Sequence, residues 1–165
     1  MPENSFEIKA PIAWMPAGLI SWYAPDGSPL ALVTSWVALV GGDMPRLRTA
    51  WHGRYDPLSR FWTDGDFILN VPSDNGLDAI REILRHGKLC LNAETTLGYS
   101  CASGVVAVAP RLLECTVQIE CVGGCLTESD FDAELCGDVA RVHRDDVILD
   151  PLDIPDLCAV SPLSP

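Results

Sequence analysis

Two groups of hydrogen-bond donors in this 165-residue sequence have the composition of an anion-binding site. An apolar run at 30–33 leads directly into the triplet Thr-Ser-Trp at 34–36. A second short run at 47–51 is followed by the triplet His-Gly-Arg at 52–54. Hydroxyls, an imidazole, a guanidinium and an open glycine backbone supply the charge-assisted and backbone donors that a phosphate group requires.

The overall charge makes these donors distinctive. The chain holds 23 Asp and Glu against 11 Lys and Arg, for a formal net charge of −12. A site built from hydrogen-bond donors therefore differs from the rest of the molecule, and it is suited to binding a phosphate group. The alternative is an ordinary hairpin with exposed polar ends.

A tight turn is expected to position the first group of donors. Asp26 and Gly27 favour such a turn, since glycine accepts a positive φ and aspartate can bond the turn backbone. The flanking segments at 18–23 and 30–33 then pair as a hairpin. If the strand at 47–51 lies beside that hairpin, both groups of donors face one spot.

The remaining pattern is mainly β. Period-two or apolar runs predict strands at 18–23, 30–33, 47–51, 67–71, 112–121 and 135–143. Capping residues predict a short helix at 55–63 and a longer one at 76–86. We expect a loop with one short strand between 88 and 103, and a turn of helix capped by Asp145 and Asp146. The sequence thus predicts one domain over 1–165, a small antiparallel β-barrel with a few helices over its openings.

The strand at 112–121 alternates most clearly. Its apolar residues predict one buried face, and its carboxylates, Glu114 and Glu120, are expected to point outward. In the following strand, Gly137 is expected to mark a bulge or a close approach of the backbone.

The amino-acid composition restricts the kinds of molecule that the protein is expected to bind. An acidic chain lacks the clustered Lys and Arg that nucleic acid or an anionic membrane requires, so we expect neither as a partner. No apolar run approaches the length of a membrane span, and the start lacks the regions of a signal peptide, which favours the cytoplasm. Seven cysteines, an odd number, are expected to be reduced thiols.

Protein-borne catalysis has little support in the sequence. The histidines at 52, 86 and 143 are scattered, and no nucleophile elbow is present, so no catalytic residue is predicted. The cysteines are spaced too widely for the usual metal motifs, so no metal is predicted. One alternative remains open, a thiol or metal protein resting on Cys115, Cys121, Cys125 and Cys136. If the protein is an enzyme, a cofactor carries the reaction.

Several motifs, in order, give the sequence a family resemblance. They are TSW at 34–36, FILNVP at 67–72, APRLLECTVQIEC at 109–121 and GDVARVHRDDVIL at 137–149. With the basic Arg54, this pattern resembles the flavin reductase-like family of FMN-binding split barrels, and within it the flavoredoxin-like branch. The resemblance implies a Greek-key antiparallel split barrel.

The resemblance also implies a cofactor and an assembly. It implies FMN at or near the interface of a homodimer, its phosphate held by 34–36 and 52–54, with Trp36 or Trp51 shielding the ring. The implied cofactor-binding residues are Thr34, Ser35, Trp36, Trp51, His52, Gly53 and Arg54. The reducing equivalents would come from NAD(P)H or a redox protein. A flavin-binding or purely structural relative without turnover is the competing reading.

Overall fold

The structure is a computed structural model that describes residues 18–34, 36–41, 44–52, 65–72, 90–128, 132–144 and 147–149. Every regular element in these ranges is a β-strand, which confirms the mainly β class. The helices predicted at 55–63 and 76–86 lie outside the described residues, as do Asp145 and Asp146. None of the described segments forms a helix of the length and apolarity needed to cross a membrane.

The described strands form one large sheet and one small one. In chain order they are β1 (Gly18–Tyr23), β2 (Pro29–Thr34), β3 (Val37–Val40), β4 (Arg46–His52), β5 (Phe67–Pro72), β6 (Cys90–Asn92), β7 (Cys101–Ser103), β8 (Pro110–Leu112), β9 (Cys115–Glu128), β10 (Asp132–Arg144) and β11 (Val147–Leu149). The large sheet runs in the order β3-β4-β10-β9-β5-β1-β2-β6, with β11 beside β10. The small sheet pairs β7 with β8.

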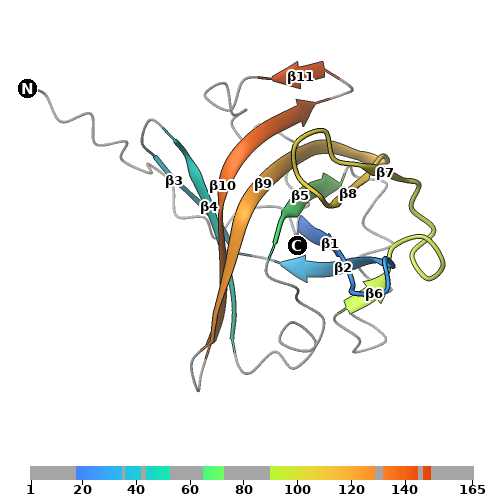
Figure 1. Cartoon of the computed structure of the whole chain (residues 1–165), viewed down its shortest axis with the longest axis horizontal. Helices are drawn as coiled ribbons and strands as arrows, with labels where there is room; N and C mark the ends of the chain where they lie inside the picture. Colours follow the sequence, from blue (N-terminus) through green and yellow to red (C-terminus); the bar gives the residue numbers. More distant parts are fainter. Residues whose placement is uncertain are drawn as a thin grey trace, which may run out of the picture.

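All of these pairs are antiparallel, and hairpins join β1 to β2, β3 to β4 and β9 to β10. β10 and β9 lie between β4 and β5 in the sheet, although β5 follows β4 in the chain, and this is the expected Greek-key order. The long strands β9 and β10 lie side by side and curve strongly, carrying the sheet around the barrel (Figure 1).

The first hairpin has the turn that the sequence predicts. Gly27 has a φ of +83°, in the left-handed region that favours glycine. The carboxylate oxygen Oδ1 of Asp26 accepts a hydrogen bond of 2.9 Å from the amide of Ser28. The turn sets the register between β1 and β2, in which Gly18 lies opposite Thr34.

The inner face of the sheet encloses an apolar core. Its largest fully buried members are Ile20, Trp22, Leu32, Leu47, Phe67, Leu69 and Ile119. They come from β1, β2, β4, β5 and β9, so the sheet must curl to bring them together. Burial of this apolar surface is the main driving force for closing the barrel.

The outer face of β1, β2, β5 and β9 is also covered. Segment 93–112, which includes β7 and β8, lies over it. Two small apolar clusters form in this layer; the first contains Leu19, Ala31, Val33, Ala93, Tyr99, Leu112 and Cys115, and the second Ile68, Ala107 and Ala109. The central strands are therefore buried on both faces, as the uniformly buried β5 illustrates.

Gly137 marks a close approach, as the sequence predicts. A Cβ atom there would lie 2.6 Å from the ring of Phe67 and 3.2 Å from the Cβ of Cys121. The pairing of β10 with β9 also shifts register between Cys136 and Asp138. Because glycine has no side chain, β9 and β10 can pair next to the Phe67 ring without displacing it.

The structure corrects the predicted strand at 112–121. It is interrupted, because β8 ends at Leu112 and β9 starts at Cys115 after a turn. Leu113 is 46% exposed in that turn, and Glu114 is exposed as predicted. Glu120, by contrast, is fully buried, because the outer layer covers the face that an open sheet would leave to solvent.

Several short strands were not predicted: β3, β8, β11 and one of the two strands, β6 and β7, that lie where the sequence predicts a single one. β3 follows the Thr-Ser-Trp triplet and pairs with β4, and β11 occupies residues that the sequence analysis placed after a helical turn. Both are only three or four residues long and depend on a neighbour for backbone partners, so their own sequences carry little signal.

Candidate functional site

The ends of β2 and β4, which carry the predicted binding residues, meet through their side chains. The hydroxyl oxygens of Thr34 and Thr49 lie 2.5 Å apart. Thr49 donates a hydrogen bond of 2.7 Å to the carbonyl oxygen of Trp36. Both threonines are buried, so their hydroxyls hold the chain at the point where it leaves β2.

Trp51 makes a second link between the two strands. Its indole Nε1 donates a hydrogen bond of 2.8 Å to the carbonyl oxygen of Val33. The ring itself is buried in the barrel core. The two strands are not adjacent in the sheet order, so these side chains, with the apolar core, hold their ends together.

Trp36 differs from Trp51 in its exposure. The Trp36 side chain is 40% exposed beside the two threonines, whereas that of Trp51 is 7% exposed. Of the two indoles that the resemblance offers as shields for a flavin ring, Trp36 is the one open to a ligand.

The second group of donors is described only in part. His52 is the last residue of β4 and lies opposite Asp132 of β10. Ser35, Gly53 and Arg54 lie outside the described residues. The structure thus brings together Thr34, Trp36 and Trp51, and the binding role of the full set stays a prediction.

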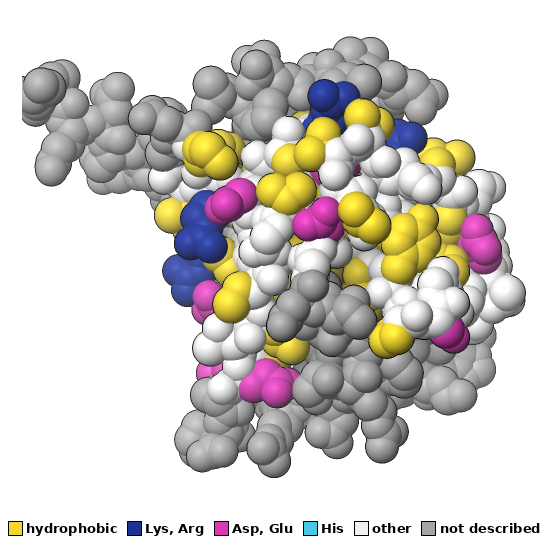
Figure 2. Space-filling model, in the orientation of Figure 1, with side chains coloured by type: hydrophobic (Ala, Val, Ile, Leu, Met, Phe, Trp, Pro, Cys, Tyr) yellow, Lys and Arg dark blue, Asp and Glu magenta, His cyan; other side chains and the backbone are white. Residues whose placement is uncertain are grey.

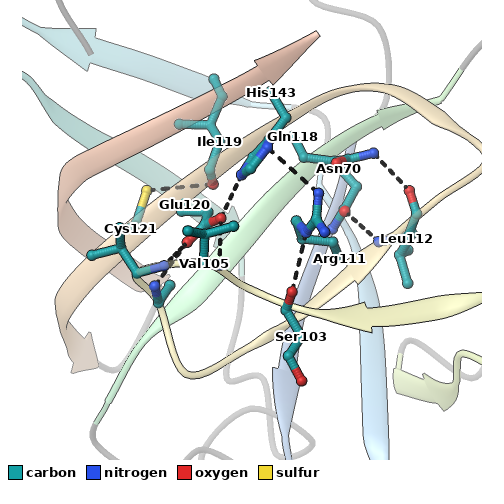
Figure 3. A network of polar contacts seen from close by, with 12 residues as sticks. Asn70, Ser103, Val105, Arg111, Leu112, Gln118, Ile119, Glu120, Cys121 and His143 are labelled. Carbon is teal, nitrogen blue, oxygen red and sulfur yellow. Dashed lines mark hydrogen bonds and ion pairs between the residues drawn. The ribbon is translucent and has the colours of Figure 1, made fainter. Parts of the chain in front are cut away.

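A second polar cluster lies between the sheet and its outer layer, centred on Glu120 of β9 (Figure 3). Its carboxylate accepts hydrogen bonds from three consecutive amides, those of Val105 at 2.9 Å, Val106 at 2.7 Å and Ala107 at 2.8 Å. The carboxylate also contacts Nε2 of His143 on β10. One buried side chain therefore anchors three consecutive residues of the loop between β7 and β8, and Asp66 accepts the amide of the next residue, Val108, at 2.8 Å.

The contacts of His143 define its tautomer. Its Nε2 faces the Glu120 carboxylate, which only accepts, while its Nδ1 lies 3.4 Å from Nη1 of Arg111, which only donates. A ring with hydrogen on Nε2 and a lone pair on Nδ1 satisfies both neighbours. Arg111 also donates from Nε to the carbonyl oxygen of Ser103 at 3.1 Å, so the chain of contacts links β10 to β7 (Figure 3).

Asn70 and Ser21 form hydrogen bonds with backbone groups in the adjoining part of the outer layer. The amide of Leu112 donates to Oδ1 of Asn70 at 2.9 Å, and Nδ2 of Asn70 donates to Oγ of Ser21 at 2.8 Å. The Ser21 hydroxyl donates to the carbonyl oxygen of Pro110 at 2.6 Å. These buried groups are therefore paired, which is the condition for burying them at low cost.

The surroundings of Glu120 favour its charged form. Burial alone would raise the pKa of this carboxyl. The amides of Val105, Ala107 and Val106, together with the contact to His143, outweigh burial and hold the pKa below its ordinary value of 4.5. A charged carboxylate surrounded by donors stabilises the loop more than a neutral acid would.

The sequence analysis missed the pairing of Glu120 with His143. Residues 104–110, Gly-Val-Val-Ala-Val-Ala-Pro, contain no polar side chain. Their backbone amides must be satisfied by a partner from elsewhere in the chain when the segment packs on the sheet. That need is the signal that could have identified a buried acceptor on β9.

The cysteines of the thiol or metal alternative are not gathered at one point. Cys121 belongs to the barrel core, and Cys115 to the outer apolar cluster. Burial raises the pKa of the Cys115 thiol to about 12 and that of Cys121 well above its ordinary value. These two thiols are therefore poor nucleophiles and poor metal ligands in the folded protein. Among the described residues, no group of three or more His, Cys, Asp or Glu could hold a metal ion.

Comparison with known proteins identifies the fold. No protein-family model matches the sequence, and neither does any curated protein. Solved structures do match. A 2-nitrobenzoate 2-nitroreductase from Pseudomonas fluorescens has a TM-score of 0.64 at 18% identity; the match covers 79% of this chain and 65% of that protein, so this chain spans less than two thirds of its length.

Two further structures match over more of their length. Flavoredoxin from Desulfovibrio vulgaris (Miyazaki F) has a TM-score of 0.60 at 19% identity, covering 90% of this chain and 79% of that one. A Shewanella frigidimarina protein described as a flavin reductase with a split-barrel domain has a TM-score of 0.65 at 17% identity, covering 96% and 85%. The chain has the split-barrel fold of these proteins, which confirms the fold that the resemblance implied.

We predict that Glu120→Gln lowers the free energy of unfolding at neutral pH by about 1–3 kcal/mol, because the neutral side chain no longer offers two charged acceptor oxygens to three amides. Because the folded-state pKa of Glu120 lies below 4.5, its contribution is present above that value and is lost as pH falls through the folded pKa. The stability difference between native chain and variant should therefore shrink below about pH 4.5. Urea unfolding at a series of pH values measures it.

Glu128→Gln is the matched control, since Glu128 lies on the same strand and is exposed. It should leave the unfolding curve nearly unchanged at every pH. A Glu120→Gln variant as stable as the native chain at pH 7 would contradict the anchoring role.

Proposed function

We propose that this chain is an FMN-binding flavoprotein of the flavin reductase-like family and that it acts as a flavin oxidoreductase of the flavoredoxin-like kind. The supporting observation is the meeting of β2 and β4 at Thr34, Trp36, Thr49 and Trp51. This is the place where the sequence puts its phosphate donors. It lies in a fold shared with a flavoredoxin and with a protein described as a flavin reductase.

The chemistry of the donors fits FMN. The segments at 34–36 and 52–54 would hold the phosphate through hydroxyls, backbone amides, His52 and the guanidinium of Arg54. The exposed indole of Trp36 would cover one face of the ring and exclude water from it. Bound FMN would supply the transfer of hydride or electrons, and the protein would supply position and electrostatics.

Arg54→Ala should weaken FMN binding most among these residues. Losing a charge-assisted contact to phosphate costs on the order of a few kcal/mol, which is about tenfold or more in Kd. Titration of the purified protein, followed by quenching of flavin fluorescence, measures the change. Arg144→Ala is the control, since Arg144 is exposed at the end of β10. FAD serves as the comparison ligand, and a protein that binds neither flavin would refute the proposal.

Turnover should be visible as reduction of the bound flavin. Anaerobic mixing of the FMN-loaded protein with NADH or NADPH should bleach the absorbance of the oxidised flavin. With a net charge of −12, the protein should also exchange electrons faster with a positively charged redox partner than with an acidic one. Failure with both nicotinamides and with candidate protein donors would leave the competing function, an FMN-binding relative without turnover.

A homodimer that completes the flavin site is part of the proposal. Hydrophobic side chains reach the surface in several places on the face shown in Figure 2. Three exposed apolar residues belong to the segment that follows β2: Trp36, Val40 and Met44. Exposed apolar groups beside a binding segment are typical of an interface, and two-fold assembly is the commonest kind.

Met44→Lys should therefore shift the protein toward the monomer, because a charge would be buried without a partner. Sedimentation velocity at micromolar concentration distinguishes the two states. Val108→Lys is the matched control, since Val108 is the most exposed large apolar residue described but belongs to the loop between β7 and β8. A native protein that sediments as a monomer with FMN bound would contradict the shared site.

A further inference from the structure

Two cysteines face each other on the long hairpin of β9 and β10. Cys125 of β9 lies directly opposite Cys136 of β10 in the antiparallel register. The next pair along the hairpin, Leu126 and Leu135, packs against the barrel core. Because side chains alternate between faces, both thiols project from the outer face of the same strand pair.

The pairing has the geometry that a disulfide requires. Residues directly opposite each other in an antiparallel pair have Cα atoms about 4.5–5.5 Å apart, and disulfides span Cα distances of about 4.4–6.8 Å. The register therefore places the Cα atoms of Cys125 and Cys136 within the range that a disulfide spans. Both cysteines are free thiols in this structure.

The backbone beside the pair can absorb small adjustments. The register shifts between Cys136 and Asp138, and Gly123 has a φ of +63°. The amide of Gly124 donates to the carbonyl oxygen of Gly65 at 2.8 Å, outside the β9–β10 ladder. A bulge of this kind bends the strand and increases its local twist.

Cys125 and Cys136 are more accessible to solvent than the other described cysteines of β9 and β10. Cys125 is exposed and Cys136 is half-buried, whereas Cys115 and Cys121 are buried and have raised thiol pKa values. A small disulfide in solution therefore reaches Cys125 first, and Cys136 lies beside it as the second thiol.

We propose that Cys125 and Cys136 form a redox-active dithiol that reduces small-molecule disulfides. The Cys125 thiolate attacks one sulfur of the disulfide RSSR; the S–S bond breaks, and one RS⁻ leaves and takes up a proton. Cys136, as thiolate, then attacks Sγ of Cys125 and releases the second RS⁻, which is protonated in turn. The protein loses two protons and two electrons, and RSSR becomes two RSH.

A disulfide at this position would also affect β4, the strand that carries the predicted flavin-binding residues Trp51 and His52. Cys136 lies opposite Arg48 of β4, and the same strand pair continues to Trp51 and His52. A disulfide would join β9 to β10 on the side away from the core and stiffen the hairpin against which β4 is held. The proposal does not depend on flavin, so its failure is separate from failure of the proposed function.

The test uses the reduced protein and the neutral probe 2-hydroxyethyl disulfide, which avoids repulsion by the acidic chain. After acid quenching, cleavage at glutamate places Cys125 with Cys121 in the peptide 121–128, and Cys136 with Cys158 in the peptide that starts at 135. Fragmentation of the linked peptides assigns the bond to one cysteine in each. Mass spectrometry should find these two peptides linked. Cys136→Ser should instead retain the probe on Cys125 at a level about tenfold or more above the native chain, because the second exchange step is missing.

Cys101→Ser is the matched control, since this partly exposed cysteine lies on β7 and should leave the link unchanged. Circular dichroism of each variant checks that the fold is retained. Probe retained on Cys125 of the native chain without a link to Cys136, or a link from Cys125 to another cysteine, would overturn the proposal.

Discussion

The hydrogen bond from the indole of Trp51 to the carbonyl of Val33 joins two strands that lie several places apart in the sheet order. The sheet must bend until its inner apolar side chains meet, and this bond lies where the bend brings its two ends together. The buried pair of Thr34 and Thr49 secures the same point with hydroxyls. The predicted cofactor segments depend on this closure, because without it their donors would lie at opposite ends of an open sheet.

The covering of the barrel's outer face imposes a second constraint. Strands buried on both faces cannot use solvent to satisfy polar groups in the outer layer, so every amide there needs an acceptor within the protein. Glu120 supplies one for three amides at once, and Asn70 supplies one for the amide of Leu112. The Ser21 hydroxyl, in turn, donates to the carbonyl oxygen of Pro110. These polar contacts act together with the small apolar clusters to hold the loop between β7 and β8 on the sheet.

Sequence reasoning captured what local chemistry determines. The turn at Gly27, the ends of β1 and the close approach at Gly137 followed from single residues whose properties have few alternatives. It failed where distant segments decide the outcome. The prediction that the Glu120 side chain points outward to solvent was wrong, because alternation distinguishes the two faces of a strand but does not show what covers each face. The strand β3 was missed because its partner β4 determines it. The binding roles of Ser35, Gly53 and Arg54 stay predictions, since they lie outside the described residues.

The anchoring of the β7–β8 loop by one carboxylate also determines how that part of the molecule opens. In a ladder, each amide has its own carbonyl partner, so neighbouring bonds can break one at a time. The amides of Val105, Val106 and Ala107 instead share the oxygens of a single side chain. When that carboxylate withdraws, all three lose their acceptor together. These three residues therefore form one cooperative unit of local unfolding, whose amide hydrogens are expected to exchange with solvent in a single event.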